Sequence, residues 1–255
     1  CDANLLASRN PSFDQDRIAG DGDVDWRTAM DYVQLLNNDN YLGYNDWRLP
    51  NINELKSLVN LGIAGIALPG GHPFTNIREG YWSSTTSPWQ RGMAQCVFLA
   101  TYTAHANMIH PAGEVIELNK DLEFYSIVYH KIYLLPVRGG STAPLIGIPA
   151  SGQTLTFMNH DDGDLRKGTA WPVPRFVDHM NGSVTDRLTG LMWTKDANLM
   201  LTRDPSYSNE FGRVTWKRAL DYAAKLNLES YLGYTDWRVP NRNELLSLID
   251  LGEYR

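Results

Sequence analysis

The sequence predicts an α+β fold, and two patterns support this prediction. After Trp26, apolar side chains recur at spacings of three and four residues, which is typical of a helix with one apolar face. From Gly80 the pattern changes, and residues 96–102 and 126–137 are rich in the β-branched and aromatic side chains that strands favour. Because the helical pattern precedes the strands and does not alternate with them, the order favours α+β over α/β.

The helical part contains residues that indicate where its first helix ends and where a second helix begins. Residues 37–40 prefer turns and end the first helix. Pro50 then disfavours helix at the residue before it, and Asn51 with Glu54 three residues later forms a capping-box pattern. A second helix is therefore predicted to start after Asn51, with Leu55, Leu58 and Val59 in the core.

Almost the same segment occurs twice. YLGYNDWRLPNINELKSL begins at Tyr41 and YLGYTDWRVPNRNELLSL begins at Tyr231. Between residues 26–62 and 216–252, 22 of 37 positions are identical, and the match extends back to DANLLASRNPS and DANLMLTRDPS. This spacing is too long for a solenoid repeat and predicts a tandem repeat of domains.

The two copies have different flanks. NGSVTDRLTGLMWTK precedes the second copy, whereas only Cys1 precedes Asp2, and the first copy continues to LLPVRGG. We therefore expect residues 1–140 to be a first domain lacking its first strand and residues 181–255 to be the first half of a second copy. Residues 141–180 read as a Pro/Gly-rich linker with an acidic turn. On this interpretation the chain is a fragment of a longer tandem protein; the alternative is that Cys1 is the lipidated first residue of a mature lipoprotein.

This organisation has a consequence for the second copy. Residues 196–255 would have amphipathic helices but no strands to cover them. We expect this half to be poorly packed or to rest on a neighbour, since its apolar face would otherwise stay wet.

Composition and charge exclude several classes. With 255 residues and 43% hydrophobic side chains the chain is globular, and no apolar run approaches the ~18 residues of a membrane span. The net charge of -6 argues against nucleic acid as a partner. The spacing of Cys1 and Cys96 excludes a zinc ribbon or a CxxC motif, and leaves both a disulfide and two free thiols open.

Three motifs resemble the Lcl C-terminal domain family of bacterial surface and secreted proteins. They are LTGLMWTKDANL, the helix followed by DWRLPNINEL, and YWSSTTS closing on LPVRGG. DWRLPNINEL and LPVRGG are also similar to motifs of the formylglycine-generating-enzyme group. The resemblance implies a C-type-lectin-like fold, in which two helices flank a small twisted antiparallel sheet and long loops hold the ligand site. It also implies a secreted or cell-surface location.

The function that the resemblance implies is an adhesin-like, non-enzymatic recognition module of an exported bacterial protein. The best-known family member binds glycosaminoglycans, but an acidic chain lacks a basic stripe, so a neutral glycan or a protein on a surface fits the charge better. The alternatives are an enzyme of the formylglycine-generating type and a structural stalk or spacer repeat. A homo-oligomer is left open.

Two irregular stretches after Trp82, SPWQRG and YTAHANMIHPAGE, are the expected recognition loops. Flat rings there can stack on a sugar or a peptide, and polar side chains can donate and accept hydrogen bonds. The predicted ligand-binding residues are Trp89, Gln90, Arg91, Tyr102, His105 and Asn107. On the alternative interpretation, Trp89 packs beneath its own loop and Tyr102 ends a core strand.

Catalytic and metal patterns are weaker. GxSxG, HExxH and phosphate-binding glycine loops do not occur, and Cys96 reads as a buried structural thiol, so we expect no enzyme. His105 and His110 have no third ligand for zinc. The acidic loop DQDRIAGDGDVDW has the oxygen-rich composition that calcium prefers, and Asp21, Asp23 and Asp25 are its candidate ligands. The alternative is a solvated acidic turn.

Overall fold

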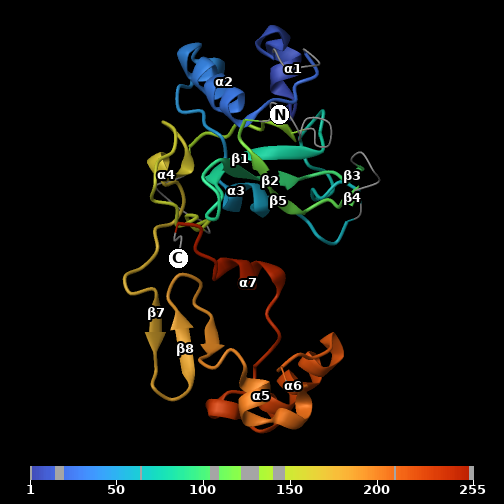
Figure 1. The fold of residues 1–255 in the computed structure, drawn as a ribbon, viewed down its shortest axis with the longest axis vertical. Helices are drawn as coiled ribbons and strands as arrows, with labels where there is room; N and C mark the ends of the chain where they lie inside the picture. The colour runs from blue at the N-terminus through green and yellow to red at the C-terminus, as the bar shows by residue number, and fades with distance from the viewer. Residues whose placement is uncertain are drawn as a thin grey trace. The chain divides into compact units, whose positions relative to one another are not determined.

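A computed structural model describes residues 2–14, 20–63, 65–103, 109–121, 132–139, 147–209 and 211–252. The chain forms two compact units, which we describe separately (Figure 1). Unit 1 is Cys1–Ala170 with Asp250–Arg255, and unit 2 is Trp171–Ile249. The domain boundaries at residues 140 and 180 stay predictions.

Unit 1 combines short helices with a mixed sheet, which confirms the α+β class. Its helices are α1 (Leu5–Arg9), α2 (Trp26–Asn38), α3 (Ile52–Ser57) and α4 (Asp162–Leu165), with 3-10 turns at Pro11–Phe13 and Tyr41–Gly43. Its strands are β1 (Gly80–Thr86), β2 (Met93–Phe98), β3 (Tyr102–Thr103), β4 (Ile109–His110), β5 (Val115–Asn119) and β6 (Ile132–Tyr133).

The main sheet of unit 1 has the strand order β5-β2-β1-β6. β2 pairs antiparallel with both β1 and β5, whereas β6 pairs parallel with β1. The expectation of a purely antiparallel sheet is wrong at this pair. The reason is topological: the chain leaves β5 at one edge and returns at the opposite edge, and such a crossover connects strands that run the same way.

The sheet lies between two helical layers (Figure 1). Because side chains alternate between the faces of a strand, Trp82 and Cys96 point to one face and Tyr81 and Val97 to the other. The first face packs against α2, through its buried residues Trp26, Ala29, Met30, Val33 and Leu36. The second face packs against α3, through Ile52 and Leu55.

β1 is buried along its whole length although four of its seven residues are Ser or Thr. Its hydroxyl groups are satisfied inside the protein. Ser83 Oγ donates to the carbonyl of Gln95 at 2.7 Å, and Thr85 Oγ1 donates to Asp162 Oδ2 at 2.6 Å. Buried polar groups are tolerated when they are bonded in this way.

The stretch 147–170 packs on unit 1 through polar contacts. Asn51 Nδ2 donates to the carbonyl of Lys167 at 2.9 Å, and the backbone N–H of Thr86 donates to Gln153 Oε1 at 3.0 Å. These bonds join this stretch to the start of α3 and to β1, so it is an ordered part of the unit.

Unit 2 has a three-stranded sheet and three helices. The sheet has the order β7-β8-β9, with β7 (Phe176–Asp178), β8 (Ser183–Asp186) and β9 (Met192–Thr194). The helices are α5 (Leu199–Arg203), α6 (Trp216–Leu228) and α7 (Arg242–Ser247), with 3-10 turns at Pro205–Tyr207 and Tyr231–Gly233. A buried Arg175–Asp186 ion pair joins the sheet to α7, because the same guanidinium donates to the carbonyl of Ser247.

The repeated sequence adopts the same local structure in both units. Both capping boxes form, at Asn51 with Glu54 and at Asn241 with Glu244, as predicted. In each copy an Asn side chain accepts from the backbone N–H of the DWR tryptophan at 2.7 Å. Leu42 and its counterpart Leu232 both have a φ of 54°.

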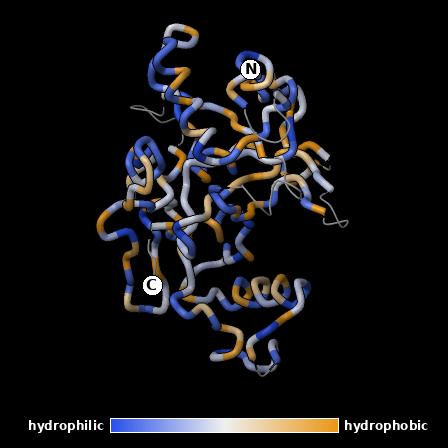
Figure 2. Tube along the Cα trace, turned by 45° about the horizontal axis from the view of Figure 1, so that its top comes forward, coloured by the Kyte–Doolittle hydropathy of each residue, from blue (hydrophilic) through white to orange (hydrophobic). Residues whose placement is uncertain are grey.

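The same residues differ in how they are covered. Trp26 is 1% exposed in unit 1, whereas its counterpart Trp216 is 69% exposed in unit 2. Leu55 and Leu245 show the same contrast, at 1% and 50%. This exposure agrees with the expectation of an uncovered second copy. No described helix is long and apolar enough to cross a membrane, and Figure 2 shows hydrophobic and hydrophilic residues alternating over short stretches of the trace.

Candidate functional site

The turn between β1 and β2 carries the first group of predicted ligand-binding residues. Ser87 organises it: its Oγ accepts from the backbone N–H groups of Trp89 and Gln90 and donates to Glu117 Oε2 at 2.7 Å. The indole of Trp89 is nevertheless 70% exposed. The interpretation that Trp89 packs beneath its own loop is therefore wrong, and a rigid turn presents a large flat ring to solvent.

Two further polar side chains flank this ring. Gln90 and Arg91 are both exposed. The Arg91 guanidinium lies 5.8 Å from the ring centre of Phe157, which belongs to the stretch 147–170. We call Trp89, Gln90 and Arg91 the Trp89 turn. Its aromatic face and neighbouring donors and acceptors make up a surface that can stack on a ring and bond to polar groups around it.

Tyr102 belongs to a different environment. It begins β3, pairs with His110 of β4 and stacks on Phe98 with an interplanar angle of 7°. His110 stacks on the same Phe98 ring, with ring centres 4.7 Å apart, and contacts Glu114 Oε2 through Nδ1. Tyr102 is half-buried against the core, and it begins the short strand β3 and does not end the core strand β2, which stops at Phe98. His105 and Asn107 lie outside the described residues.

The structure separates the two groups along the sheet. The Trp89 turn precedes Met93 at the start of β2, and Tyr102 follows Phe98 at its end. At about 3.3 Å per strand residue, these ends are about 17 Å apart. The four described residues among the six, Trp89, Gln90, Arg91 and Tyr102, therefore do not surround one ligand of monosaccharide size.

The acidic loop uses its carboxylates locally. Asp25 caps α2 by accepting from the backbone N–H of Thr28 at 2.6 Å, and Asp21 Oδ1 accepts from the N–H of Asp23. Asp14 Oδ2 accepts from two backbone N–H groups in the same loop. In the described part of the chain, no cluster of three His, Cys, Asp or Glu side chains could hold a metal ion. Calcium binding at Asp21, Asp23 and Asp25 stays a prediction.

Cys96 is fully buried in β2, as predicted, and burial raises the pKa of its thiol. The reactive form of cysteine is the thiolate, which this environment disfavours. Arg48 is a buried structural donor. Its guanidinium forms two bonds of 2.6 Å to the Glu54 carboxylate.

Lys120, at the end of β5, is a buried charge that the sequence patterns do not indicate. Its ammonium donates to Thr86 Oγ1 at 2.7 Å and lies 4.4 Å and 4.7 Å from the ring centres of Trp26 and Phe157. Burial lowers the pKa of Lys120 to about 8, against the raising effect of the Asp161 charge. Lys120 connects the sheet, α2 and the stretch 147–170, so we assign it a structural role.

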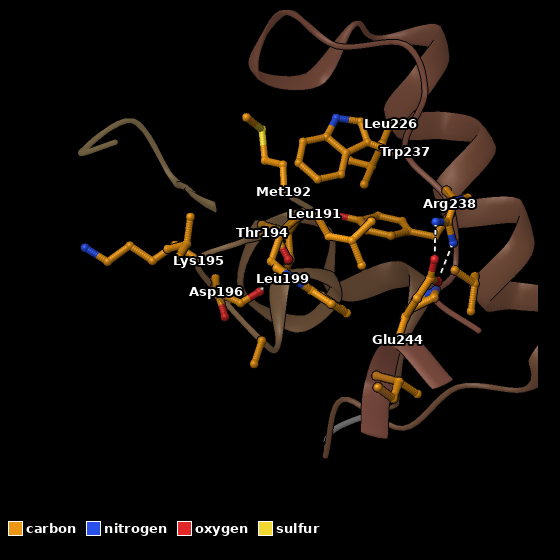
Figure 3. A pocket seen from close by; sticks show the side chains of 18 of the residues that line it. Leu191, Met192, Thr194, Lys195, Asp196, Leu199, Leu226, Trp237, Arg238 and Glu244 are labelled. Atoms are coloured by element: carbon orange, nitrogen blue, oxygen red, sulfur yellow. Dashed lines mark hydrogen bonds and ion pairs between the residues drawn. The ribbon is translucent and has the colours of Figure 1, made fainter. Parts of the chain in front are cut away.

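Unit 2 contains a cavity of about 840 Å³ that sequence reasoning also missed. Its apolar lining includes Leu226, Trp237, Leu245 and Leu248 together with β9 residues, and Figure 3 shows Leu226 and Trp237 side by side. Its polar lining includes the Arg238–Glu244 ion pair, the side chains of Lys195, Asp196, Asn198 and Asp236, and the indole N–H of Trp193, which is buried and has no hydrogen-bond partner among the described residues. A comparison of the two repeats could have predicted this cavity, because Leu226 and Leu245 correspond to Leu36 and Leu55, which are core residues of the first copy.

Comparisons with known proteins give one informative result. The model of the Lcl C-terminal domain family matches residues 6–115 and 182–255, which together make up most of the chain. The first matched stretch includes the Trp89 turn and Tyr102, and the second includes the lining of the cavity from Val184 onward. No curated protein and no solved structure matches the chain.

Proposed function

Because the chain belongs to the Lcl C-terminal domain family, we propose that it is a recognition module of an exported bacterial protein. In this proposal the protein is adhesin-like and non-enzymatic, with tandem copies of a C-type-lectin-like domain. It binds a glycan or a protein on a surface through the Trp89 turn of unit 1.

The observation that carries the proposal is the exposed indole of Trp89 on a turn that is fixed from below. Covering an indole removes a large apolar area from water, and Trp is enriched among the residues that contribute most to binding at interfaces. Ser87 holds the turn through three hydrogen bonds and thereby reduces the conformational entropy that binding must overcome. Recognition sites are commonly built in this way, as loops on a rigid scaffold.

The charge of the protein narrows the ligand class. The chain has a net charge of -6, and the Trp89 turn adds one arginine, which does not make a basic stripe. A neutral glycan, whose apolar ring face stacks on the indole while its hydroxyl groups meet Gln90 and Arg91, suits this surface better than a sulfated one.

An enzyme of the formylglycine-generating type is the less favoured alternative. Its chemistry requires an accessible, ionisable thiol, whereas Cys96 is fully buried in a strand and burial raises its pKa. We therefore assign Cys96 to the core.

The proposal is tested by a glycan and protein array probed with the full chain, followed by the variant Trp89→Ala. We expect binding of the identified ligand to weaken at least about tenfold, with an unchanged melting temperature, because the indole is a surface group. Leu42→Ala is the matched control, since it removes an equally exposed apolar side chain elsewhere in unit 1. A blank array favours the stalk interpretation, and equal weakening in both variants shows non-specific apolar binding.

A further inference from the structure

The space that is a cavity in unit 2 is occupied by strands of the sheet in unit 1. In unit 1, β1 and β2 lie between α2 and α3 and contact both helices. In unit 2 the equivalent helices are α6 and α7, and their equivalent faces line the cavity or lie exposed. The residues concerned are Trp216, Ala219, Leu220, Ala223 and Leu226 on α6, Leu245 on α7, and Leu248 directly after α7.

In unit 1, the polar groups equivalent to those around the cavity are hydrogen-bonded to extended segments of the sheet part. In unit 1, the backbone of Arg48 exchanges two hydrogen bonds with Val137, both of 2.9 Å, and the carbonyl of Pro50 accepts from the N–H of Ser84. The indole N–H of Trp26 donates to the carbonyl of Ser83 at 2.8 Å. Each of these bonds joins the helical part of unit 1, which runs from α2 to α3, to an extended segment that follows it in the chain.

The equivalent groups of unit 2 have no such bonds. The backbone N–H and C=O of Arg238, the carbonyl of Pro240 and the indole N–H of Trp216 have no hydrogen-bond partner among the described residues. The guanidinium of Arg238 remains paired with Glu244 but is 55% exposed, compared with 4% for Arg48. Unit 2 therefore presents unpaired backbone groups beside an apolar face.

We propose that this cavity is a docking surface for a β-sheet, and that its occupant is an antiparallel strand pair with the residue pattern of β1 and β2. The pattern places an aromatic side chain where Trp82 contacts α2, and small or apolar side chains where Ala94, Cys96 and Phe98 do. The extended backbone of this strand pair supplies the partners for Pro240 and Trp216, as Ser84 and Ser83 do in unit 1, and a further extended segment equivalent to that of Val137 supplies the partners for Arg238.

The unpaired backbone groups distinguish this occupant from a second copy of the exposed helix. A helix surface bonds its own backbone groups internally, so packing α6 against another α6 would cover the apolar face but leave Arg238 and Pro240 unpaired. An extended strand has free N–H and C=O groups at regular spacing, and it can satisfy both requirements.

The test extends the full chain after Arg255 with a copy of residues 66–139, which carries the strand pair. Amide hydrogen exchange of α6 (residues 216–228) is then measured by mass spectrometry, with and without the extension. We expect protection to rise at least about tenfold, because docking covers the face that is now exposed. The extended chain carrying Trp82→Asp and Phe98→Asp in the added copy is the matched control, and it should show no gain.

Two variants of the parent chain locate the contact. Trp216→Ala should abolish the gain, whereas Leu228→Ala should leave it intact, because Leu228 is exposed at a position outside the apolar face. If the extended chain is insoluble, a synthetic peptide of residues 80–98 is titrated into the full chain and the same exchange is measured. No gain with a soluble partner overturns the proposal. So does protection that depends on protein concentration alone, since that indicates self-association.

Discussion

At the scale of the residue, Lys120 makes a prediction about pH. Its folded-state pKa of about 8 lies below its ordinary value of 10.5, so between these values the unfolded chain binds more protons than the folded one. Stability from this group therefore rises with pH from 8 towards 10. We expect Lys120→Met, which cannot ionise, to have a flatter profile, by up to about 1.4 kcal/mol per pH unit. Urea unfolding at pH 7.5, 8.5 and 9.5 measures it.

The control for this prediction is a second lysine. Lys217 is 83% exposed on α6 and pairs with Asp221, so Lys217→Met should leave the slope between pH 8 and 10 unchanged. Measurements stay below pH 10, because burial raises the pKa values of Tyr81 and Tyr133 and these groups would add an opposite slope above it. Parallel profiles for wild type and Lys120→Met would contradict the assignment.

Single residues of the site were only partly predictable. The sequence places Trp89 in an irregular stretch after Trp82 and so indicates a loop, but not whether its ring faces water. The burial of Lys120 depends on Trp26 and Phe157, which are distant in sequence, so no local pattern indicates it. The placing of Tyr102 is also tertiary, since its stacking on Phe98 follows from the β3–β4 pair.

At the scale of the element, the two DWR segments form a natural comparison. Arg48–Glu54 and Arg238–Glu244 have the same partners and the same two-bond geometry, but only the first guanidinium is buried. Breaking a buried pair leaves an uncompensated charge and costs about 3–5 kcal/mol, whereas exposed pairs contribute about 0–1 kcal/mol. We expect Arg48→Met to destabilise unit 1 by about 3 kcal/mol and Arg238→Met to destabilise unit 2 by much less. Urea unfolding of the two variants decides it, and equal losses would show that burial is not the cause.

Helices were predictable because their signals are local. The apolar spacing after Trp26 indicates α2, and the Asn51–Glu54 pair indicates the start of α3. Each signal involves residues that are only a few positions apart in the chain. The strands were predicted only in part: residues 96–102 overlap the end of β2 and residues 126–137 contain β6, whereas β1 and β5 were not indicated, because pairing joins residues far apart. β5 has no clear strand pattern, and β1 is rich in Ser and Thr, whose burial depends on partners such as Gln95 and Asp162. Order and register of the sheet are therefore tertiary information.

At the scale of the whole molecule, α2 and α6 test how much of a helix's stability comes from its surroundings. Both have 13 residues, side-chain N-caps and similar sequences, but only α2 has its apolar face covered. Isolated helices of this length are marginal in water, so packing supplies most of their stability. We expect the amides of α2 to be protected from hydrogen exchange at least about 100-fold more than those of α6, and heating to unfold unit 2 before unit 1. Equal protection in a monomer, verified by sedimentation, would show that the helices are stable on their own and that coverage by the sheet does not determine the difference.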